Sequence, residues 1–303
     1  MLLTQLRNLL AVVDSGSIRG AARNLSVSQP ALTRSLRQLE TELRVKLLER
    51  TARGVAPTTA GRAFIARSRV IHNELGRAKE ELAQLVGEDR GSVAFGIGPH
   101  GAMHVVPPAL AQFRRAHANT EVRIAEGPPH VLLPRLRQGS LDFAIGGRPQ
   151  GHLDPGIKAS PLLLSKLMVG ARKGHPLQNA RSLRELVDAS WVIYTPAGWS
   201  GAIVPDVFEK NGLPSPKSVV LSESYLALVT IIARTDTLAA LGSRVFEQRI
   251  AQEFIQPLRL KERLPEITHC LFTRADSPLT PVAGAMVGAI TAVARQLAHT
   301  AAR

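Results

Sequence analysis

The sequence is poor in cysteine: Cys270 is the single one in 303 residues. One cysteine excludes an internal disulfide framework and a cysteine-rich zinc site, and it suits a reducing cytosol. No uninterrupted apolar run reaches the ~18 residues of a membrane span, and the N-terminal MLLTQLRNLLAVVDSGS has neither the basic region nor the apolar core of a secretory signal. We therefore expect a cytoplasmic protein without a structural metal.

Sequence signatures of the common hydrolases and metalloenzymes are missing as well. There is no His-Glu-x-x-His metal motif and no Gly-x-Ser-x-Gly nucleophile elbow, since GWSGA at Gly198 to Ala202 has a different spacing. Cys270 lies in an apolar, strand-like segment, where a thiol is expected to be buried and inert. The sequence therefore predicts no catalytic residues and a function other than catalysis.

Aromatic residues make up only 4% of the chain, while the formal charge is +14. Residues 1–69 hold 12 Lys and Arg against 4 Asp and Glu, and the remainder holds 26 against 20. This asymmetry indicates that the N-terminal part meets a polyanion, although a generic basic surface has the same composition. The first aromatic residue is Phe64. Because proteins that bind RNA or single strands stack bases on aromatic rings, the expected polyanion is double-stranded DNA.

Helical periodicity and capping residues divide the N-terminal part into three helices. The first is expected from Leu2 to Val13, and a short second one over 18–25, with Ser17 as its N-cap and small residues in its middle. Ser28 is the expected N-cap of the third helix, and Pro30 is well tolerated in its first turn. Two short helices joined by a tight turn are typical of a helix-turn-helix, whose second helix enters the major groove.

The outer face of the third helix carries side chains suited to reading DNA. Glutamine can bind adenine, arginine can bind guanine or phosphate, and hydroxyl groups can bind either. The candidate DNA-binding residues of this helix are Ser28, Gln29, Pro30, Thr33, Arg34 and Arg37.

The segment KLLERTARGVAPTTAG then predicts a small β-hairpin with Gly54 in its turn. Such a hairpin would form a wing that places Arg50 or Arg53 against the DNA backbone or the minor groove. A solvated surface charge is the alternative for each arginine.

A long helix is expected from Thr58 or Thr59 to about Leu85, with one narrow apolar stripe whose steps alternate between four and three residues. A narrow stripe on a long helix favours dimerisation, and packing against the rest of the same chain is the alternative. The candidate dimerisation residues are Phe64, Ile71, Leu75, Ala78, Leu82 and Leu85, with Ser68 between them. The following GEDRG, residues 87–91, reads as a hinge.

From Ser92 onward strand-like and helical segments alternate, which predicts α/β structure with parallel strands. One group of segments begins with SVAFGI, a second begins near Pro161, and ITHCLFTR and a helix over 281–302 close the chain. This organisation predicts two small α/β lobes with a cleft between them.

The loop after SVAFGI contains Gly96-x-Gly98-x-x-Gly101, the spacing of a dinucleotide-binding turn. Glu126 stands near the position of a ribose-binding acid and supports a cofactor site, whereas Pro99, Pro107 and Pro108 argue against one. Two alternatives are a tight turn with only a structural role and a ligand-binding loop. Backbone N–H groups at a helix N-terminus attract anions, so a ligand bound there is expected to be anionic.

At this point the sequence resembles a known family. LAVVDSGSIRGAARNLSVSQPALTRSLRQLETEL, followed by LLERTARGVAPTTAG, is similar to the N-terminal domain of LysR-type transcriptional regulators. RLRQGSLDFAIGG and ARTDTLAALGSRV resemble segments of their effector domain. The family usually has phenylalanine where Leu9, Ile18 and Leu48 stand, and glycine at Arg44, which puts the local turn there in doubt.

The resemblance implies an α+β multidomain fold. Its expected parts are a winged helix-turn-helix over 1–58, a linker and dimerisation helix over 59–86, a hinge over 87–91 and a periplasmic-binding-protein-like effector domain over 92–303. Within that domain, lobe I would comprise 92–160 and 267–303, and lobe II 161–266. Matching strand ends supply the candidate effector-binding residues His100, Gly101, Pro128, Pro129, His130, Thr195, Trp199, Ser200 and Ser222.

The sequence therefore predicts a bacterial LysR-type regulator that binds dyad-symmetric promoter DNA and responds to a small-molecule effector. Family analogy adds RNA polymerase as a partner, a homotetramer built from dimers, and a place on the bacterial nucleoid. The alternative function is an α/β enzyme that uses NAD or FAD and carries an attached DNA-binding domain.

Overall fold

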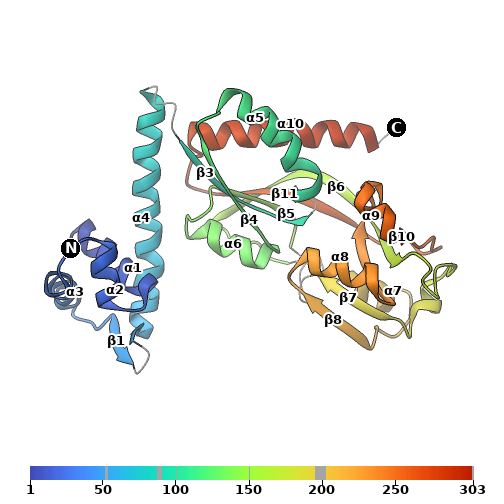
Figure 1. Cartoon of the computed structure of the whole chain (residues 1–303), viewed down its shortest axis with the longest axis horizontal. Coiled ribbons are helices and arrows are strands. Elements are labelled where there is room, and N and C mark those ends of the chain that lie inside the picture. The colour runs from blue at the N-terminus through green and yellow to red at the C-terminus, as the bar shows by residue number, and fades with distance from the viewer. Residues whose placement is uncertain (52–53, 87–90, 100, 150, 195–202, 302–303) are drawn as a thin grey trace. The chain divides into compact units, whose positions relative to one another are not determined.

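The computed structural model describes the chain except for residues 52–53, 87–90, 100, 150, 195–202 and 302–303. Two compact units are present (Figure 1). The first comprises Met1–Glu88 with Arg137–Ser140, and the second comprises Asp89–Leu136 with Leu141–Arg303.

The first unit begins with three helices, α1 (Leu3–Ser15), α2 (Ile18–Asn24) and α3 (Gln29–Leu43). The expected caps are in place: the side chain of Ser17 accepts a hydrogen bond from the N–H of Gly20, and that of Ser28 from the N–H of Ala31. These hydroxyls satisfy N–H groups that a helix start otherwise leaves unpaired. Capping chemistry therefore sets where α2 and α3 begin.

A small aliphatic core holds these helices together. Ala21 and Ala22 of α2 are buried and allow a close approach, and Leu32, Leu36 and Leu39 of α3 fill the space that remains. A hydrogen bond of 2.9 Å from the Asn8 amide to the Ser35 hydroxyl adds a polar link between α1 and α3. One face of α3 is therefore fixed in the core, and the other is left for solvent or a partner.

Arg44 ends α3 in the left-handed conformation, with φ 55° and ψ 31°. The turn that glycine would make cheaply therefore forms with arginine in its place. Left-handed backbone costs a non-glycine residue about 1–2 kcal/mol. The helix packing and the hydrogen bonds from the N–H groups of Arg44 and Val45 to the end of α3 hold this conformation.

The expected hairpin is formed by β1 (Leu48–Thr51) and β2 (Gly54–Pro57), which pair antiparallel. Glu40 of α3 anchors its start, because its carboxylate accepts hydrogen bonds from the N–H groups of Leu47 and Leu48 at 2.8 and 3.2 Å. Helix α4 (Thr59–Leu85) follows, capped by Thr58. Gly61 is required there, since a Cβ at this position would lie 1.9 Å from the carbonyl oxygen of Leu47.

The second unit is built on a sheet in the order β4-β3-β5-β11-β6-β9-β7-β8, with β10 paired to β6. Its strands are β3 (Ser92–Ile97), β4 (Glu121–Glu126), β5 (Phe143–Gly147), β6 (Ile157–Arg172), β7 (Ser190–Tyr194), β8 (Ser218–Ser222), β9 (Thr237–Gly242), β10 (Ile255–Pro257) and β11 (Glu266–Arg274). Its α-helices are α5 (Val106–Ala116), α6 (Pro129–Arg137), α7 (Ile203–Lys210), α8 (Tyr225–Arg234), α9 (Arg249–Phe254) and α10 (Pro281–Ala301).

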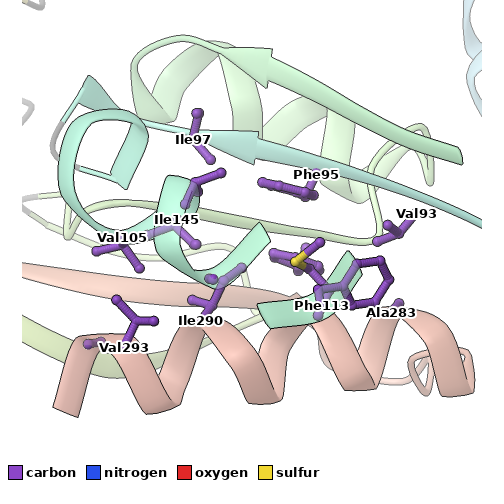
Figure 2. Close-up of a cluster of buried hydrophobic side chains, with 14 of the residues drawn as sticks. Val93, Phe95, Ile97, Val105, Phe113, Ile145, Ala283, Ile290 and Val293 are labelled. Carbon is purple, nitrogen blue, oxygen red and sulfur yellow. The ribbon is translucent and has the colours of Figure 1, made fainter. Parts of the chain in front are cut away.

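Helices cover both faces of the strands in the first lobe (Figure 1). Phe143 and Ile145 of β5 belong to the cluster formed with α5 and α10, whereas Ala144 between them belongs to the cluster formed with α6. Figure 2 shows Ile290 and Val293 of α10 directed towards the β-strands and Val105. By length and composition α10 could cross a membrane, but its buried stripe packs into this core.

The second lobe repeats the arrangement. Trp191 and Ile193 of β7 pack with α7 in one cluster, and Val192 packs with α8 and α9 in another. Strands β7, β8 and β9 are parallel, as are β3, β4 and β5.

The prediction of parallel strands is wrong for β6, β10 and β11, which pair antiparallel. Strand β6 has 16 residues; its first part pairs with β11 and its last part with β9 and β10. The expected boundary between the lobes at 160/161 therefore falls within one continuous strand. Two long crossing strands, β6 and β11, join the lobes and place their middle residues between them.

Candidate DNA-binding surface and ligand cavity

The outer face of α3 presents the predicted DNA-binding residues to solvent. Ser28, Gln29, Pro30, Arg34 and Arg37 are exposed. Thr33 is half-buried, and its hydroxyl donates a hydrogen bond of 2.9 Å to the carbonyl oxygen of Gln29. The N-terminal half of α3 therefore offers a neutral hydrogen-bonding end followed by two cations on the exposed face.

The charges on this face are uncompensated. Within the described part of the chain, neither Arg34 nor Arg37 has an acidic partner within ion-pair distance, whereas Lys46 pairs with Glu40 at 2.8 Å and Arg69 pairs with Asp14. Cations without an internal partner remain available for phosphate or base contacts. Arg50 lies in β1, opposite Val55, and Arg53 lies outside the described residues.

Helix α4 divides the predicted dimerisation residues into two groups. Phe64 packs on the core of the first unit, and Ser68 is also buried. Further along, Ile71, Leu82 and Leu85 are 43, 63 and 68% exposed, Ala78 is exposed, and Leu75 is half-buried. The amino-terminal end of the stripe thus serves the fold of its own chain, while the carboxy-terminal end leaves large apolar side chains uncovered.

A cavity of about 110 Å³ lies between the two lobes of the second unit. Both crossing strands contribute to it, with Ser165 and Leu167 from β6 and Ile267 and His269 from β11. The remaining lining residues are Gly98, Pro99, Pro129, Gly147, Val192, Ile193, Tyr194, Ile203, Val204, Tyr225, Ala240, Leu241, Gly242 and Val245. A ligand in this cavity would touch both lobes at once, and its surroundings would be mostly apolar.

The predicted effector-binding residues are placed unevenly around this cavity. Pro129, at the start of α6, lines the cavity, and Gly101 is buried in a π-helical turn, Gly101–Val105, that precedes α5. His130 lies 3.4 Å from the Glu223 carboxylate, and the Ser222 hydroxyl donates to the Ser224 carbonyl. Pro128 precedes α6, and its carbonyl accepts the first hydrogen bonds of that helix. His100, Thr195, Trp199 and Ser200 lie outside the described residues.

Sequence reasoning missed several cavity residues, above all Tyr194, Tyr225, Ser165 and His269. Tyr194 stands immediately before Thr195 in the sequence, but it was not among the predicted residues. Ser165 and His269 lie in the middle of strands, and no strand-end rule selects such residues. Their common signal is that β6 and β11 are long enough to serve two lobes.

The described residues of the glycine-rich loop have structural roles. The N–H of Gly98 donates to the carbonyl of Ile145 at 2.7 Å, and Pro99 has no N–H to offer. Gly96 is needed for packing, since a Cβ there would lie 2.9 Å from the Leu132 side chain. Pro107 and Pro108 stand in the first turn of α5, which directly follows the π-helical turn Gly101–Val105, so the helical run after the loop is irregular.

Burial controls the ionisation of the cavity side chains. Burial, together with the neighbouring His104, lowers the pKa of His269 to about 4. Burial also raises the pKa of both Tyr194 and Tyr225, and the Glu126 carboxylate adds to each effect. At neutral pH the histidine and both tyrosines are therefore uncharged.

The histidine gives a pH-dependent stability. Because the pKa of His269 is about 4 in the folded protein and 6.5 ordinarily, the unfolded chain binds the extra proton between these values, and stability falls as the pH is lowered through that window. We expect the parent to lose about 2–3 kcal/mol more unfolding free energy than His269→Gln when the pH is lowered from 7.5 to 4.5. Urea unfolding at both pH values measures the difference, and equal losses in the two proteins would contradict it.

Comparison with known proteins places both units. Residues 3–62 match the family model "Bacterial regulatory helix-turn-helix protein, lysR family", and residues 87–295 match "LysR substrate binding domain". The HTH-type transcriptional regulator GbpR of Azospirillum brasilense is 32% identical over 301 residues, covering 96% of this chain and 86% of that protein. The HTH-type transcriptional regulator GalR of Pseudomonas putida is 30% identical over 293 residues, covering 95% and 73%.

Solved structures agree on the fold. The crystal structure of CbnR, a LysR family transcriptional regulator, matches with a TM-score of 0.71 at 20% identity, over 97% of this chain and 99% of that one. A full-length OxyR variant from Pseudomonas aeruginosa matches with a TM-score of 0.70 at 23% identity, over 97% and 95%. With a winged helix-turn-helix in the first unit and a two-lobed ligand domain in the second, this chain belongs to the LysR family of DNA-binding transcriptional regulators controlled by an effector.

Proposed function

We propose that this regulator reads dyad-symmetric promoter DNA with α3, pairs through α4, and changes its DNA complex when a small molecule occupies the cavity between its lobes. The observation that carries the proposal is the exposed face of α3, where Gln29, Arg34 and Arg37 stand without acidic partners among the described residues. A helix presented in this way fits the major groove. CbnR, which shares the fold, has been solved in a complex with its target DNA.

A dimer follows from the uncovered end of α4. Ile71, Leu82 and Leu85 recur at heptad spacing and are largely exposed in the single chain, so a second copy of the same helix would bury them. A two-fold dimer presents two α3 helices, and a symmetric pair of helices requires a symmetric pair of half-sites. Phe64 and Leu75 would contribute at the edge of the seam.

The wing and the loops at the cavity complete the proposed contacts. Arg50 and Arg53 would meet the DNA backbone, while Ser28 and Thr33 would meet phosphates beside the bases. Ligand contacts would come from Pro129 and the loop at Gly101, and from the segment that holds Thr195, Trp199 and Ser200. His100, Pro128, His130 and Ser222 are proposed for the rim of the same site.

Ligand control would act through the lobes. Since the cavity is lined by both lobes and by both crossing strands, a bound molecule can stabilise one lobe arrangement over another. An effector changes activity only if its affinity differs between the two arrangements. We further propose that the protein works by binding rather than catalysis, in the cytoplasm on nucleoid DNA, as a tetramer of two dimers that contacts RNA polymerase.

Selection of DNA by the purified full-length protein tests this function. Random duplexes enriched over several rounds should converge on an inverted repeat whose half-site centres lie about one helical turn, or a multiple of it, apart. A selection that yields one unrepeated half-site would contradict the dimeric reading. Enrichment that depends only on charge and vanishes with salt would contradict sequence recognition by α3.

A further inference from the structure

We propose that the molecule recognised by the cavity is uncharged, mostly apolar and about the size of one six-membered ring. The proposal rests on the proposed function only for the effect of ligand binding on DNA, and the residues that line the cavity determine the kind of ligand. It departs from the anionic effector that the glycine-rich loop led us to expect.

The volume of the described cavity suits a small ligand. Its volume is about 110 Å³, and an engineered apolar protein cavity of roughly 150 Å³ binds benzene. Most of the lining consists of aliphatic side chains or glycine, including Leu167, Ile193, Val204 and Leu241. Tyr194 and Tyr225 add two aromatic rings whose centroids are 5.7 Å apart and nearly perpendicular. Edge-to-face tyrosines offer a ring-sized ligand a flat apolar contact.

The described part of the lining also lacks a cation that could balance an anion. Among the described residues that line the cavity there is no Lys, Arg, Asp or Glu. The one described histidine in the lining, His269, is held neutral by burial. An anion entering an apolar site without a compensating cation loses its hydration and gains no ionic partner.

The charged groups near the cavity also favour a neutral ligand over an anion. Burial raises the pKa of the Tyr194 hydroxyl, and the Glu126 and Glu223 carboxylates raise it further, so both carboxylates act on this part of the cavity wall. Two described positions of the loop offer no N–H to an anion, because Gly98 donates its N–H to Ile145 and Pro99 has none. A carboxylate ligand would add a further negative charge beside Glu126 and Glu223, whereas a neutral ligand would not.

Hydroxyl groups give the cavity a few polar contacts. The hydroxyl of Tyr194 is buried and has no hydrogen-bond partner among the described residues, and an unsatisfied buried donor costs about 1–3 kcal/mol. Ser165 of β6 adds a second hydroxyl to the lining. A neutral ligand that carries one alcohol or carbonyl oxygen could accept a hydrogen bond without bringing a charge into the cavity.

Three probes of equal ring size test the charge preference. Benzyl alcohol, benzoate and benzylammonium are titrated calorimetrically into the full-length protein at pH 7.5. We expect benzyl alcohol to bind at least tenfold more tightly than either ion. Equal or tighter binding of benzoate or benzylammonium would overturn the proposal, and so would the absence of benzyl alcohol binding at millimolar concentrations.

Filling the cavity tests the location. Ala240 of β9 lines the cavity and is half-buried, so Ala240→Phe should abolish benzyl alcohol binding. If the phenylalanine variant does not fold, Ala240→Leu is the second test, and its smaller side chain should weaken the binding. Circular dichroism verifies the fold of each variant. Undiminished binding by a folded variant would place the ligand elsewhere. DNA binding by the parent without any probe is measured separately, so a failed regulator function and a failed ligand class give different results.

Discussion

Replacing Leu82 and Leu85 with glutamate is expected to convert the proposed dimer into monomers. Both side chains are more than 60% exposed in the single chain, so the substitutions should leave the fold of each unit intact. In a pair of α4 helices, each residue would instead lie in the seam, where a carboxylate loses its hydration and meets a like charge from the second copy.

The expected weakening of the dimer is large because each substitution is present in both subunits of a two-fold dimer. Burying one leucine side chain contributes about 1.5–3 kcal/mol. Four leucines lost from one dimer therefore remove about 6 kcal/mol or more, which weakens association on the order of 10⁴-fold. Sedimentation equilibrium of the parent and the variant across a concentration series measures this change directly.

A matched control places the same charge elsewhere on α4. Ala66 and Gly76 are exposed positions off the seam, and a Cβ at Gly76 would meet no atom within 4 Å. Ala66→Glu with Gly76→Glu should leave the dimer intact. Persistent dimers of the Leu82→Glu, Leu85→Glu protein would assign the exposed stripe another role, and monomers in both variants would point to net charge rather than the seam.

Local chemistry made the first unit predictable. Ser17, Ser28 and Thr58 each accept a hydrogen bond from an N–H group three residues further along the chain, so four consecutive residues contain both the cap and the helix start. The dimer seam on α4 was harder to predict, because hydrophobic periodicity does not show where an apolar stripe stops packing on its own chain. Phe64 and Leu82 lie on the same apolar stripe, and only packing distinguishes Phe64, which is half-buried on the core of the first unit, from Leu82, which is exposed.

The cavity could not be predicted in the same way, because its residues come from distant parts of the chain. Ser165 and His269 become neighbours of one cavity through the antiparallel pairing of β6 with β11, and no local pattern encodes that pairing. Arg44 shows the opposite case: the family pattern predicts glycine, and the turn persists because its surroundings hold the backbone in place.

Gln29→Ala is expected to reduce the discrimination between the selected DNA site and random duplex by roughly 5- to 150-fold. Gln29 is the first residue of α3 and is exposed, which is where the recognition helix of a helix-turn-helix meets the bases. A glutamine bound to adenine through both of its amide groups contributes about 1–3 kcal/mol of discrimination. Competition binding with the selected site and a scrambled duplex measures the ratio.

Two comparisons separate base reading from charge. Gln38→Ala removes an equally exposed glutamine from the carboxy-terminal half of α3, and this change should leave discrimination unaltered. Arg37→Ala should weaken binding to both duplexes and reduce the salt dependence by about one ion, whereas Gln29→Ala should leave the salt dependence unchanged because glutamine releases no counterion. If Gln29→Ala binds both duplexes as the parent does, α3 does not read bases through its first turn, and sequence recognition must come from the arginines or the wing.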